Sequence, residues 1–202
     1  MFQDELFSNS VEQIPLNEGD VTLHRSFMDF KNANKVFELL INDLNWKQDS
    51  IRIYGRALPI PRLNAWYGDK GCNYKYSGIQ METNNWSDSL NMIRDQIEKS
   101  LSLKFNSCLA NLYRNGQDSV SWHSDDEAEL GKNPTICSVS FGEERKFQIR
   151  NKQNKNDKET IILTHNSVLI MQGNTQHIYE HQVPKELGKL NPRINLTFRN
   201  VY

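Results

Sequence analysis

The chain has 202 residues, of which 37% are hydrophobic, 10% aromatic and 24% charged, with a formal net charge of -1 at pH 7. A mean hydropathy of -0.70 and the lack of a long apolar run argue against a membrane protein or a membrane partner. The near-zero net charge gives no overall attraction to nucleic acid, so such a partner would need a local binding patch.

The first 21 residues are polar and irregular, which predicts a loosely ordered lead-in to a single domain over residues 22–202. They open with MFQDELFSNSVEQ, which is acidic and lacks the basic-then-apolar order of a signal peptide. The chain has three cysteines, an odd number without CxxC spacing, which favours reduced thiols over a disulfide framework. We therefore expect a cytoplasmic protein, or a nuclear one if the source is eukaryotic.

Two amphipathic helices are predicted in the N-terminal half. In residues 27–46 apolar side chains recur at spacings near three and four, at Phe30, Val36, Phe37, Leu40, Ile41 and Leu44. The second helix, SDSLNMIRDQIEKSL over residues 87–101, opens with a Ser or Asp cap. One face of it carries Leu90, Ile93, Ile97 and Leu101.

Beyond about residue 105 the pattern changes to strands. Short segments rich in β-branched or aromatic residues alternate with Gly, Asn, Asp or Pro: SCLANLYRN, TICSVSFG, RKFQIRN, ETIILTH, SVLIMQG and RINLTFRNVY. The polar run NKQNKNDKE over residues 151–159 is typical of a solvated hairpin loop. This half therefore predicts roughly six to eight short strands in a sandwich, barrel or jelly roll.

The stretch VSWHSDDEAELG over residues 120–131 crowds four acids around one histidine. In a strand, residues i and i+2 share a face, so His123 and Asp125 can point into the same space. A second histidine would complete the 2-His-1-carboxylate set of non-haem Fe(II) oxygenases. The alternative is a surface turn, because a bare HxD pair recurs by chance in unrelated proteins.

Four other histidines could supply the third ligand. His24 lies in the lead-in and His165 at a turn between two strands, which makes both less suitable. His177 and His181 are the better candidates, and spacing alone does not choose between them.

The C-terminal strand PRINLTFRNVY has one polar and one apolar face. The polar face holds Arg193, Asn195, Thr197 and Arg199, and the apolar face Ile194, Leu196 and Phe198. Two guanidinium groups and an amide on an inward face would suit a small dicarboxylate, whereas a solvated face is the alternative. ANLYRN offers a matching polar pair, Asn111 and Tyr113, so the strands predict a barrel with a polar interior.

These motifs resemble, in order, the AlkB-type Fe(II)/2-oxoglutarate dioxygenases, which oxidatively remove alkyl groups from nucleic-acid bases. The resemblance covers about residues 46–202 through PRLNAWYGD, YKYSG, FNSCLANLYRNG, WHSDDE, SVSFG, HQVPKE and PRINLTFR. It is closest to the homologue 3 branch at PRLNAWYG and HQVPKE. The resemblance implies a mainly β fold with flanking helices (α+β), a double-stranded β-helix or jelly roll over about residues 105–202, and a nucleotide-recognition region at about 46–80.

The resemblance also implies roles for individual residues. His123, Asp125 and His181 match the iron ligands, so His181 is preferred over His177. Arg193 matches the residue that pairs with the C5 carboxylate of 2-oxoglutarate. The other 2-oxoglutarate contacts that it implies are Asn111, Tyr113, Asn195 and Arg199.

Further matches concern the substrate. Asp126 and Glu127 match acids near the lesion base. Tyr74 and Tyr76, in YKYSG, match aromatics that line the base pocket, although an ordinary strand with tyrosines on one face is the alternative.

The segment DSIRIYGRALPIPR lies before the predicted barrel. Its arginines, which include Arg62, suit phosphates, and Tyr54 suits a stacking ring or a wedge that fills the gap left by a flipped base.

The function implied is repair of 1-methyladenine and 3-methylcytosine in DNA or RNA, which consumes 2-oxoglutarate and O2 at Fe(II) and releases formaldehyde. We expect a monomer. The resemblance implies a preference for single strands, because duplex-preferring relatives carry a strongly basic loop just after the second iron histidine, whereas in HQVPKELGKLNPR Lys185 and Lys189 are offset by Glu186. The alternative is a hydroxylase of a protein or small molecule, since fold does not determine substrate. A non-enzymatic binding module would not need both the iron ligands and the two arginines.

Overall fold

The computed structural model describes residues 11–53, 56–72, 75–76, 79–80, 83–188 and 190–202, with the backbone alone for residues 52, 53, 75, 76, 79 and 80. Within these ranges an eight-stranded sheet has the order β1-β2-β14-β11-β16-β9-β5-β8. Its strands are β1 Val11–Gln13, β2 Asp20–His24, β14 Ser167–Gln172, β11 Ile136–Gly142, β16 Arg193–Arg199, β9 Ser107–Tyr113, β5 Leu63–Gly68 and β8 Thr83–Asn84. Neighbouring strands are antiparallel except β5 and β8.

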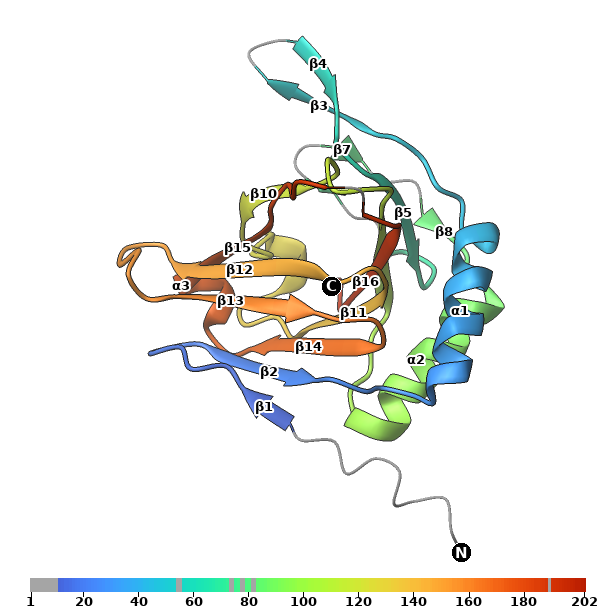
Figure 1. Ribbon diagram of the computed structural model, residues 1–202, viewed down its shortest axis with the longest axis horizontal. Helices are drawn as coiled ribbons and strands as arrows, with labels where there is room; N and C mark the ends of the chain where they lie inside the picture. Colours follow the sequence, from blue (N-terminus) through green and yellow to red (C-terminus); the bar gives the residue numbers. More distant parts are fainter. Residues whose placement is uncertain (1–10, 54–55, 73–74, 77–78, 81–82, 189) are drawn as a thin grey trace, which may run out of the picture.

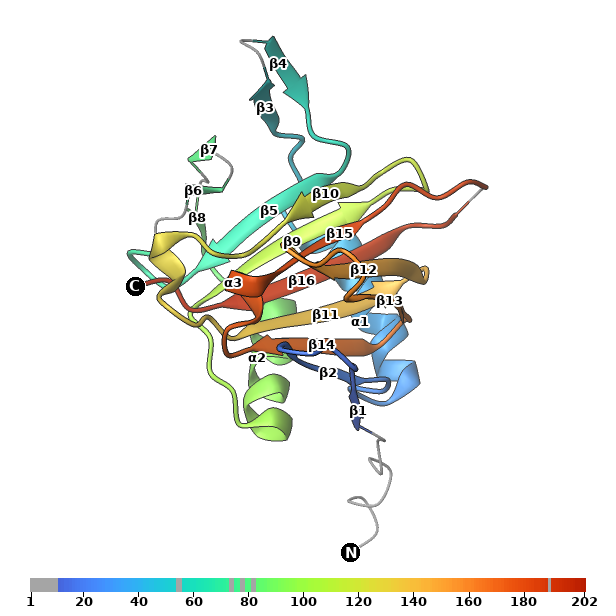
Figure 2. The same cartoon turned by 90° about the vertical axis from the view of Figure 1, so that its left-hand side faces the viewer.

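A smaller sheet lies against the large one. Its order among the described residues is β10-β15-β12-β13, with bounds β10 Val120–His123, β15 Tyr179–Val183, β12 Arg145–Asn151 and β13 Lys158–Leu163. Two hairpins complete the strands: β3 Ser50–Ile53 with β4 Arg56–Pro59, and β6 Lys75–Tyr76 with β7 Ile79–Gln80. The β3–β4 hairpin projects away from both sheets (Figure 2). The predicted mainly β jelly roll with flanking helices is confirmed.

The helices are α1 Phe30–Asp43, α2 Asp88–Leu101, the short α3 Thr175–Ile178 and the 3-10 turn η1 Ala128–Leu130. Both predicted long helices are present, and each begins after a side-chain cap. The Asp29 carboxylate accepts from Asn32 N at 3.1 Å, and the Ser87 hydroxyl accepts from Leu90 N at 3.3 Å. No helix in the described part of the chain is long and apolar enough to cross a membrane.

Helices α1 and α2 cover the outer side of the large sheet (Figure 1). Between them and the sheet lies one apolar cluster, which includes Leu40, Ile93 and Leu196. A second cluster, which includes Leu109 and Phe147, lies between the two sheets. Because successive strand residues face opposite sides, a strand of the large sheet can give apolar residues to the helices and polar residues to the interior.

Two expectations need correction. Of the expected lead-in, residues 1–10 lie outside the described residues, but residues 11–21 are not loosely ordered, because β1 and the start of β2 extend the large sheet: Val21 is opposite Met171 of β14, and both are buried. Phe30, predicted on the apolar face of the first helix, is 62% exposed and lies at 5.0 Å from the His165 ring. The first turn of α1 lies at the rim of the sheet, where that side chain meets solvent.

Candidate active site

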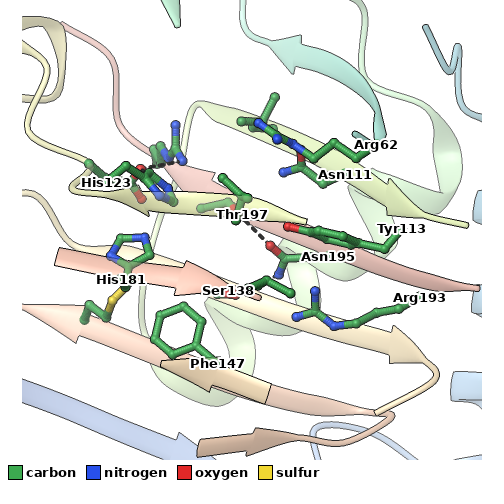
Figure 3. A pocket seen from close by; sticks show the side chains of 16 residues that line it. Arg62, Asn111, Tyr113, His123, Ser138, Phe147, His181, Arg193, Asn195 and Thr197 are labelled. Carbon is green, nitrogen blue, oxygen red and sulfur yellow. Dashed lines mark hydrogen bonds and ion pairs between the residues drawn. The ribbon is translucent and has the colours of Figure 1, made fainter. Parts of the chain in front are cut away.

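A pocket opens between the two sheets and is lined from both of them (Figure 3). The small sheet and the coil after β10 contribute His123, Asp125 and His181. The large sheet contributes polar side chains of β9, β11 and β16. Figure 3 shows the two histidines at one end of the pocket and Arg193 at the other.

Strand register brings the two histidines together. His123, the last residue of β10, is directly opposite His181 of β15, and their ring centroids are 4.3 Å apart. Asp125 lies just beyond the strand, with Oδ1 at 3.9 Å from His123 Nε2. One potential ligand atom from each of the three residues lies within 4.8 Å of the others, the one such group among the described residues.

The expected strand geometry is corrected here, because β10 ends at His123 and Asp125 belongs to the following coil. Asp125 is held there by two contacts, one to its backbone and one to its carboxylate. Gln176 Oε1 accepts from the backbone N–H of Asp125 at 2.9 Å, and Arg199 Nη2 donates to Asp125 Oδ1 at 3.0 Å. Gln176 was not anticipated, and no local pattern in TQHIYEH marks it.

Burial sets the charge states that a divalent metal needs. Burial lowers the pKa of His181 to about 3, and the neighbouring His123 adds to this effect. Burial also lowers the pKa of His123. Burial by itself would raise the pKa of Asp125, but Arg199 and the two histidines hold it below its ordinary value. At neutral pH the group therefore offers two neutral imidazoles and one carboxylate.

The other histidines lie elsewhere. His177, in α3, is exposed and contacts the Lys132 carbonyl and the Asn133 side chain. His165 accepts from the Gly142 N–H at 2.9 Å, and His24 is in β2. The geometry thus identifies His181 rather than His177 as the third candidate metal ligand, a choice that sequence spacing alone left open.

Arg193 dominates the other end of the pocket. It is 1% exposed, and its Nη2 donates to Ser140 Oγ at 2.9 Å. Its Nε and Nη1 are buried without a hydrogen-bond partner among the residues that the structure describes. Burial lowers its pKa to about 10, which still leaves it charged at neutral pH. A buried cation with unsatisfied donors calls for an anionic ligand such as a carboxylate.

Of the remaining expected cosubstrate contacts, Asn111, Tyr113 and Asn195 lie on the same stretch of β9 and β16 as Arg193, whereas Arg199 lies at the metal end and pairs with Asp125. In the register of β16 with β9, Arg193 is opposite Tyr113 and Asn195 is opposite Asn111. The Asn195 amide donates to Ser138 Oγ at 2.7 Å. Ser138 and Ser140 were not anticipated, although the alternating serines of SVSFG on an apolar strand are a signal for polar residues on one face.

The residues expected to contact the substrate differ in burial, and some of them lie outside the described residues. Arg62 is buried rather than presented to phosphates: its Nε donates to Asn111 Oδ1 at 2.9 Å and its Nη1 to the Ser119 carbonyl at 3.2 Å. Asp126 is exposed beside Lys152 Nζ, at 3.2 Å, and Glu127 is partly buried just before η1. Tyr54 and Tyr74 lie outside the described residues, and Tyr76 belongs to β6, described by its backbone alone.

Comparison with known proteins agrees with this geometry. The family description "2OG-Fe(II) oxygenase superfamily" matches residues 11–199. The chain belongs to this superfamily. It is therefore an Fe(II)- and 2-oxoglutarate-dependent dioxygenase that uses O2, and the buried His-Asp-His group and the unsatisfied Arg193 fit the metal and the dicarboxylate.

Individual relatives support the resemblance to AlkB-type dioxygenases. This oxygenase is 45% identical over 201 residues to "Alpha-ketoglutarate-dependent dioxygenase alkB homolog 3" of Bos taurus, covering 95% of this chain and 70% of the relative. It is 34% identical over 219 residues to "DNA oxidative demethylase ALKBH2" of Arabidopsis thaliana, with 95% and 70% covered. A solved structure, "The structure of OsALKBH1", shares the fold with a TM-score of 0.65 at 16% identity, over 94% of this chain and 99% of that one.

Proposed function

We propose that this oxygenase demethylates N-alkylated bases in nucleic acid, with 1-methyladenine and 3-methylcytosine as substrates. The similarity over nearly the whole chain to proteins named alkB homolog 3 and DNA oxidative demethylase carries the proposal. The pocket supports it, because the candidate metal ligands and a buried arginine lie at its two ends.

The bound metal, cosubstrate and O2 supply the oxidation: 2-oxoglutarate is decarboxylated, the methyl carbon is hydroxylated and formaldehyde leaves the base. In our proposal His123, Asp125 and His181 hold Fe(II) as two neutral nitrogens and one carboxylate oxygen. Arg199 keeps Asp125 charged and oriented. Arg193 binds one carboxylate of 2-oxoglutarate through donors that have no other described partner.

The remaining polar residues shape the cosubstrate site in this proposal. Asn111, Tyr113, Asn195 and Arg199 would contact 2-oxoglutarate from β9 and β16, Arg199 at the end next to Asp125. Arg62 would act through Asn111, whose carbonyl oxygen accepts from Arg62 Nε. Apolar side chains of Phe147 and others line the same pocket and limit the water that can enter.

On the substrate side, Asp126 and Glu127 follow the metal ligands directly and remain our candidates for contacts to the base. Tyr54, Tyr74 and Tyr76 remain predictions from the sequence. We also propose that the protein is a monomer, that it acts in the cytoplasm or nucleus, and that it prefers single strands.

The direct test is incubation of the purified protein with Fe(II), 2-oxoglutarate and single-stranded oligonucleotides that carry one 1-methyladenine or 3-methylcytosine. Mass spectrometry should show loss of the methyl group together with formaldehyde and succinate. A protein that converts 2-oxoglutarate to succinate but leaves every methylated oligonucleotide intact would favour the alternative, a hydroxylase of a protein or small molecule.

A further inference from the structure

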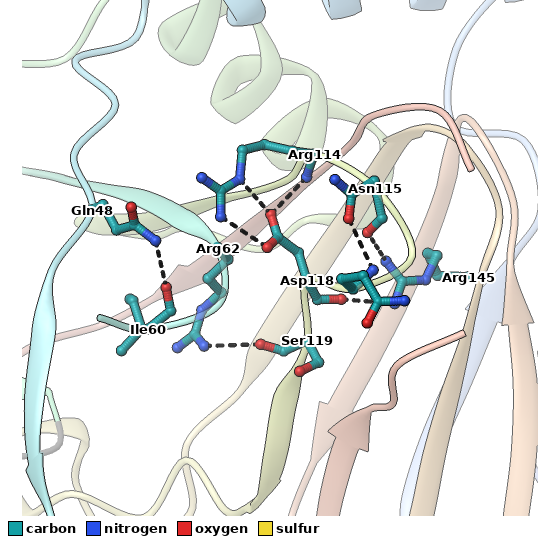
Figure 4. Close-up of polar contacts among 9 residues, drawn as sticks. Gln48, Ile60, Arg62, Arg114, Asn115, Asp118, Ser119 and Arg145 are labelled. Atoms are coloured by element: carbon teal, nitrogen blue, oxygen red, sulfur yellow. Dashed lines mark hydrogen bonds and ion pairs between the residues drawn. The ribbon is translucent and has the colours of Figure 1, made fainter. Parts of the chain in front are cut away.

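Arg145, the first residue of β12, is one of the largest fully buried side chains in the described part of the protein. Its guanidinium donates to two carbonyls of the loop between β9 and β10, that of Asn115 at 3.3 Å and that of Asp118 at 2.9 Å (Figure 4). It also donates to the Pro184 carbonyl at 2.7 Å and to Glu186 Oε1 at 3.2 Å. One side chain thus ties together the loop of residues 114–119 and the loop that begins at residue 184 and leads to β16, of which residue 189 lies outside the described residues.

These two loops touch each other as well. The Glu186 N–H donates to the Gly116 carbonyl at 2.8 Å, and Glu186 Oε1 also accepts from the Lys146 N–H at 2.9 Å. A Cβ on Gly116 would collide with the Glu186 carbonyl, so the backbones pack too closely for any larger residue. Within the first loop Arg114 pairs with the Asp118 carboxylate at 2.7 Å.

Both loops lead directly into the candidate 2-oxoglutarate site. The first follows Tyr113, the last residue of β9, and the second precedes Arg193, the first residue of β16. The Arg145 guanidinium lies 5.5 Å from the centre of the Tyr113 ring, and that of Arg193 lies 5.2 Å from the same ring. Arg145 therefore contacts the side chain that separates it from the cosubstrate pocket, but it does not line the pocket.

The candidate metal ligands are farther along the same strands. The first loop leads into β10 and the second leaves β15 at the end of this strand pair where Val120 is opposite Val183. His123 and His181 are the next residues paired across the two strands, and the register shifts between the two pairs. Asp125 has its own supports in Gln176 and Arg199. A change at Arg145 should therefore disturb the cosubstrate end more than the metal end.

We propose that Arg145 is a positioning residue for 2-oxoglutarate, which holds the Tyr113 ring and the start of β16 so that Arg193 meets the carboxylate. This inference rests on the proposed 2-oxoglutarate site at Arg193 and Tyr113. A guanidinium suits the position because its five N–H donors, spread over a planar fork, can reach four separated acceptors at once, whereas an ammonium has three donors on a single nitrogen.

The test compares Arg145→Met and Arg145→Lys with the unchanged protein. Calorimetry gives the Kd of 2-oxoglutarate with Mn(II) in place of Fe(II), and the Kd of Mn(II) by itself. Arg145→Met should raise the Kd of 2-oxoglutarate about ten-fold, and Arg145→Lys less, about three-fold, with Mn(II) affinity unchanged. With Fe(II) and substrate, the KM for 2-oxoglutarate should rise while kcat at saturating 2-oxoglutarate is retained.

Arg150→Met is the matched control on the same strand. Its guanidinium lies 3.8 Å from the centre of the partly buried Trp122 ring and pairs with Glu180 at 2.8 Å, away from the pocket lining. This variant should leave the Kd of 2-oxoglutarate unchanged. Thermal unfolding of each variant shows whether it is folded at the temperature of the titration, and if Arg145→Met is not, Arg145→Lys decides.

Two results would overturn the inference. One is a folded Arg145 variant with unchanged 2-oxoglutarate affinity, and the other is parallel loss of Mn(II) and 2-oxoglutarate affinity, which indicates general damage. Arg193→Met separates the inference from its premise. If Arg193→Met binds 2-oxoglutarate normally, the proposed site itself is wrong and the role of Arg145 falls with it; if only Arg193→Met loses affinity, the site stands and the role of Arg145 is wrong.

Discussion

His181 shows how burial prepares a side chain for metal binding. It is 5% exposed, and burial keeps it unprotonated at neutral pH, so its ring can act as a ligand without first losing a proton. His177 lies four residues earlier but is exposed, and its ring contacts the Lys132 carbonyl instead. The two histidines therefore provide a matched pair of variants.

We expect His181→Ala to weaken Fe(II) binding and turnover by about 100-fold or more, because it removes one of three candidate ligands. His177→Ala should leave both within about two-fold, since surface substitutions rarely disturb a distant site. Metal titration and demethylation assays on the two purified variants check this. Loss of turnover in His177→Ala with normal turnover in His181→Ala would reverse the assignment.

Arg193 is a buried cation, and two of its nitrogens, Nε and Nη1, have no hydrogen-bond partner among the described residues. Arg193→Met should weaken 2-oxoglutarate binding by about 2–5 kcal/mol, since a buried charged partner is lost. The ligand-free variant should be no less stable than the original protein, because an incompletely paired buried charge is replaced by an apolar side chain of similar length. Thermal unfolding with and without 2-oxoglutarate measures both effects. A variant that 2-oxoglutarate still stabilises as strongly would contradict the prediction.

At the scale of elements, α2 covers the large sheet but contributes nothing to the lining of the pocket. Its buried residues Leu90, Ile93 and Ile97 pack toward the sheet whose opposite face carries the cosubstrate residues. The helix should therefore affect stability and leave ligand binding alone.

Ser87→Ala tests that separation. It removes the hydroxyl that caps α2 and should lower the free energy of unfolding by about 1 kcal/mol, with the Kd of 2-oxoglutarate unchanged. Ser100→Ala, in the last turn of the same helix, is the control and should cost less, because its exposed hydroxyl only accepts from Gln96. Denaturant unfolding and calorimetry give the two quantities. Equal losses of unfolding free energy in the two variants would contradict the stabilising role of the Ser87 cap.

For the whole molecule, charge bears on the choice of nucleic acid. The net charge of -1 provides little general attraction to phosphates. Glu186 was expected to offset Lys185 and Lys189, but its carboxylate accepts from Arg145 Nε and from the Lys146 N–H. The preference for single strands therefore rests on the net charge and on the cost of unpairing a duplex.

Repair of one lesion in a single strand should be faster than in the matched duplex by about five-fold or more, because the enzyme avoids an unpairing cost of a few kcal/mol. Raising the salt concentration should slow both reactions only weakly, since few phosphates are neutralised. Initial rates on matched oligonucleotides at fixed salt decide the question. Faster repair of the duplex would overturn the preference and leave the chemistry intact.

Local periodicity was sufficient for several features. The alternation in RINLTFR correctly separated polar Asn195 from apolar Leu196, because side chains of a strand alternate between its faces whatever its neighbours are. The same holds for α2, whose apolar spacing and Ser87 cap depend only on helix geometry. The motif order identified the family.

Tertiary structure alone decided which distant residues meet. His181 could be told from His177 by residue patterns only through a resemblance, whereas the pairing of β10 with β15 places His181 opposite His123. Arg62 was expected to meet phosphates, yet it is buried, and so is Arg145, for which the sequence made no prediction; loops far apart in the chain surround both with carbonyl acceptors. No pattern within a few residues records such acceptors, since they come from segments that only folding brings together.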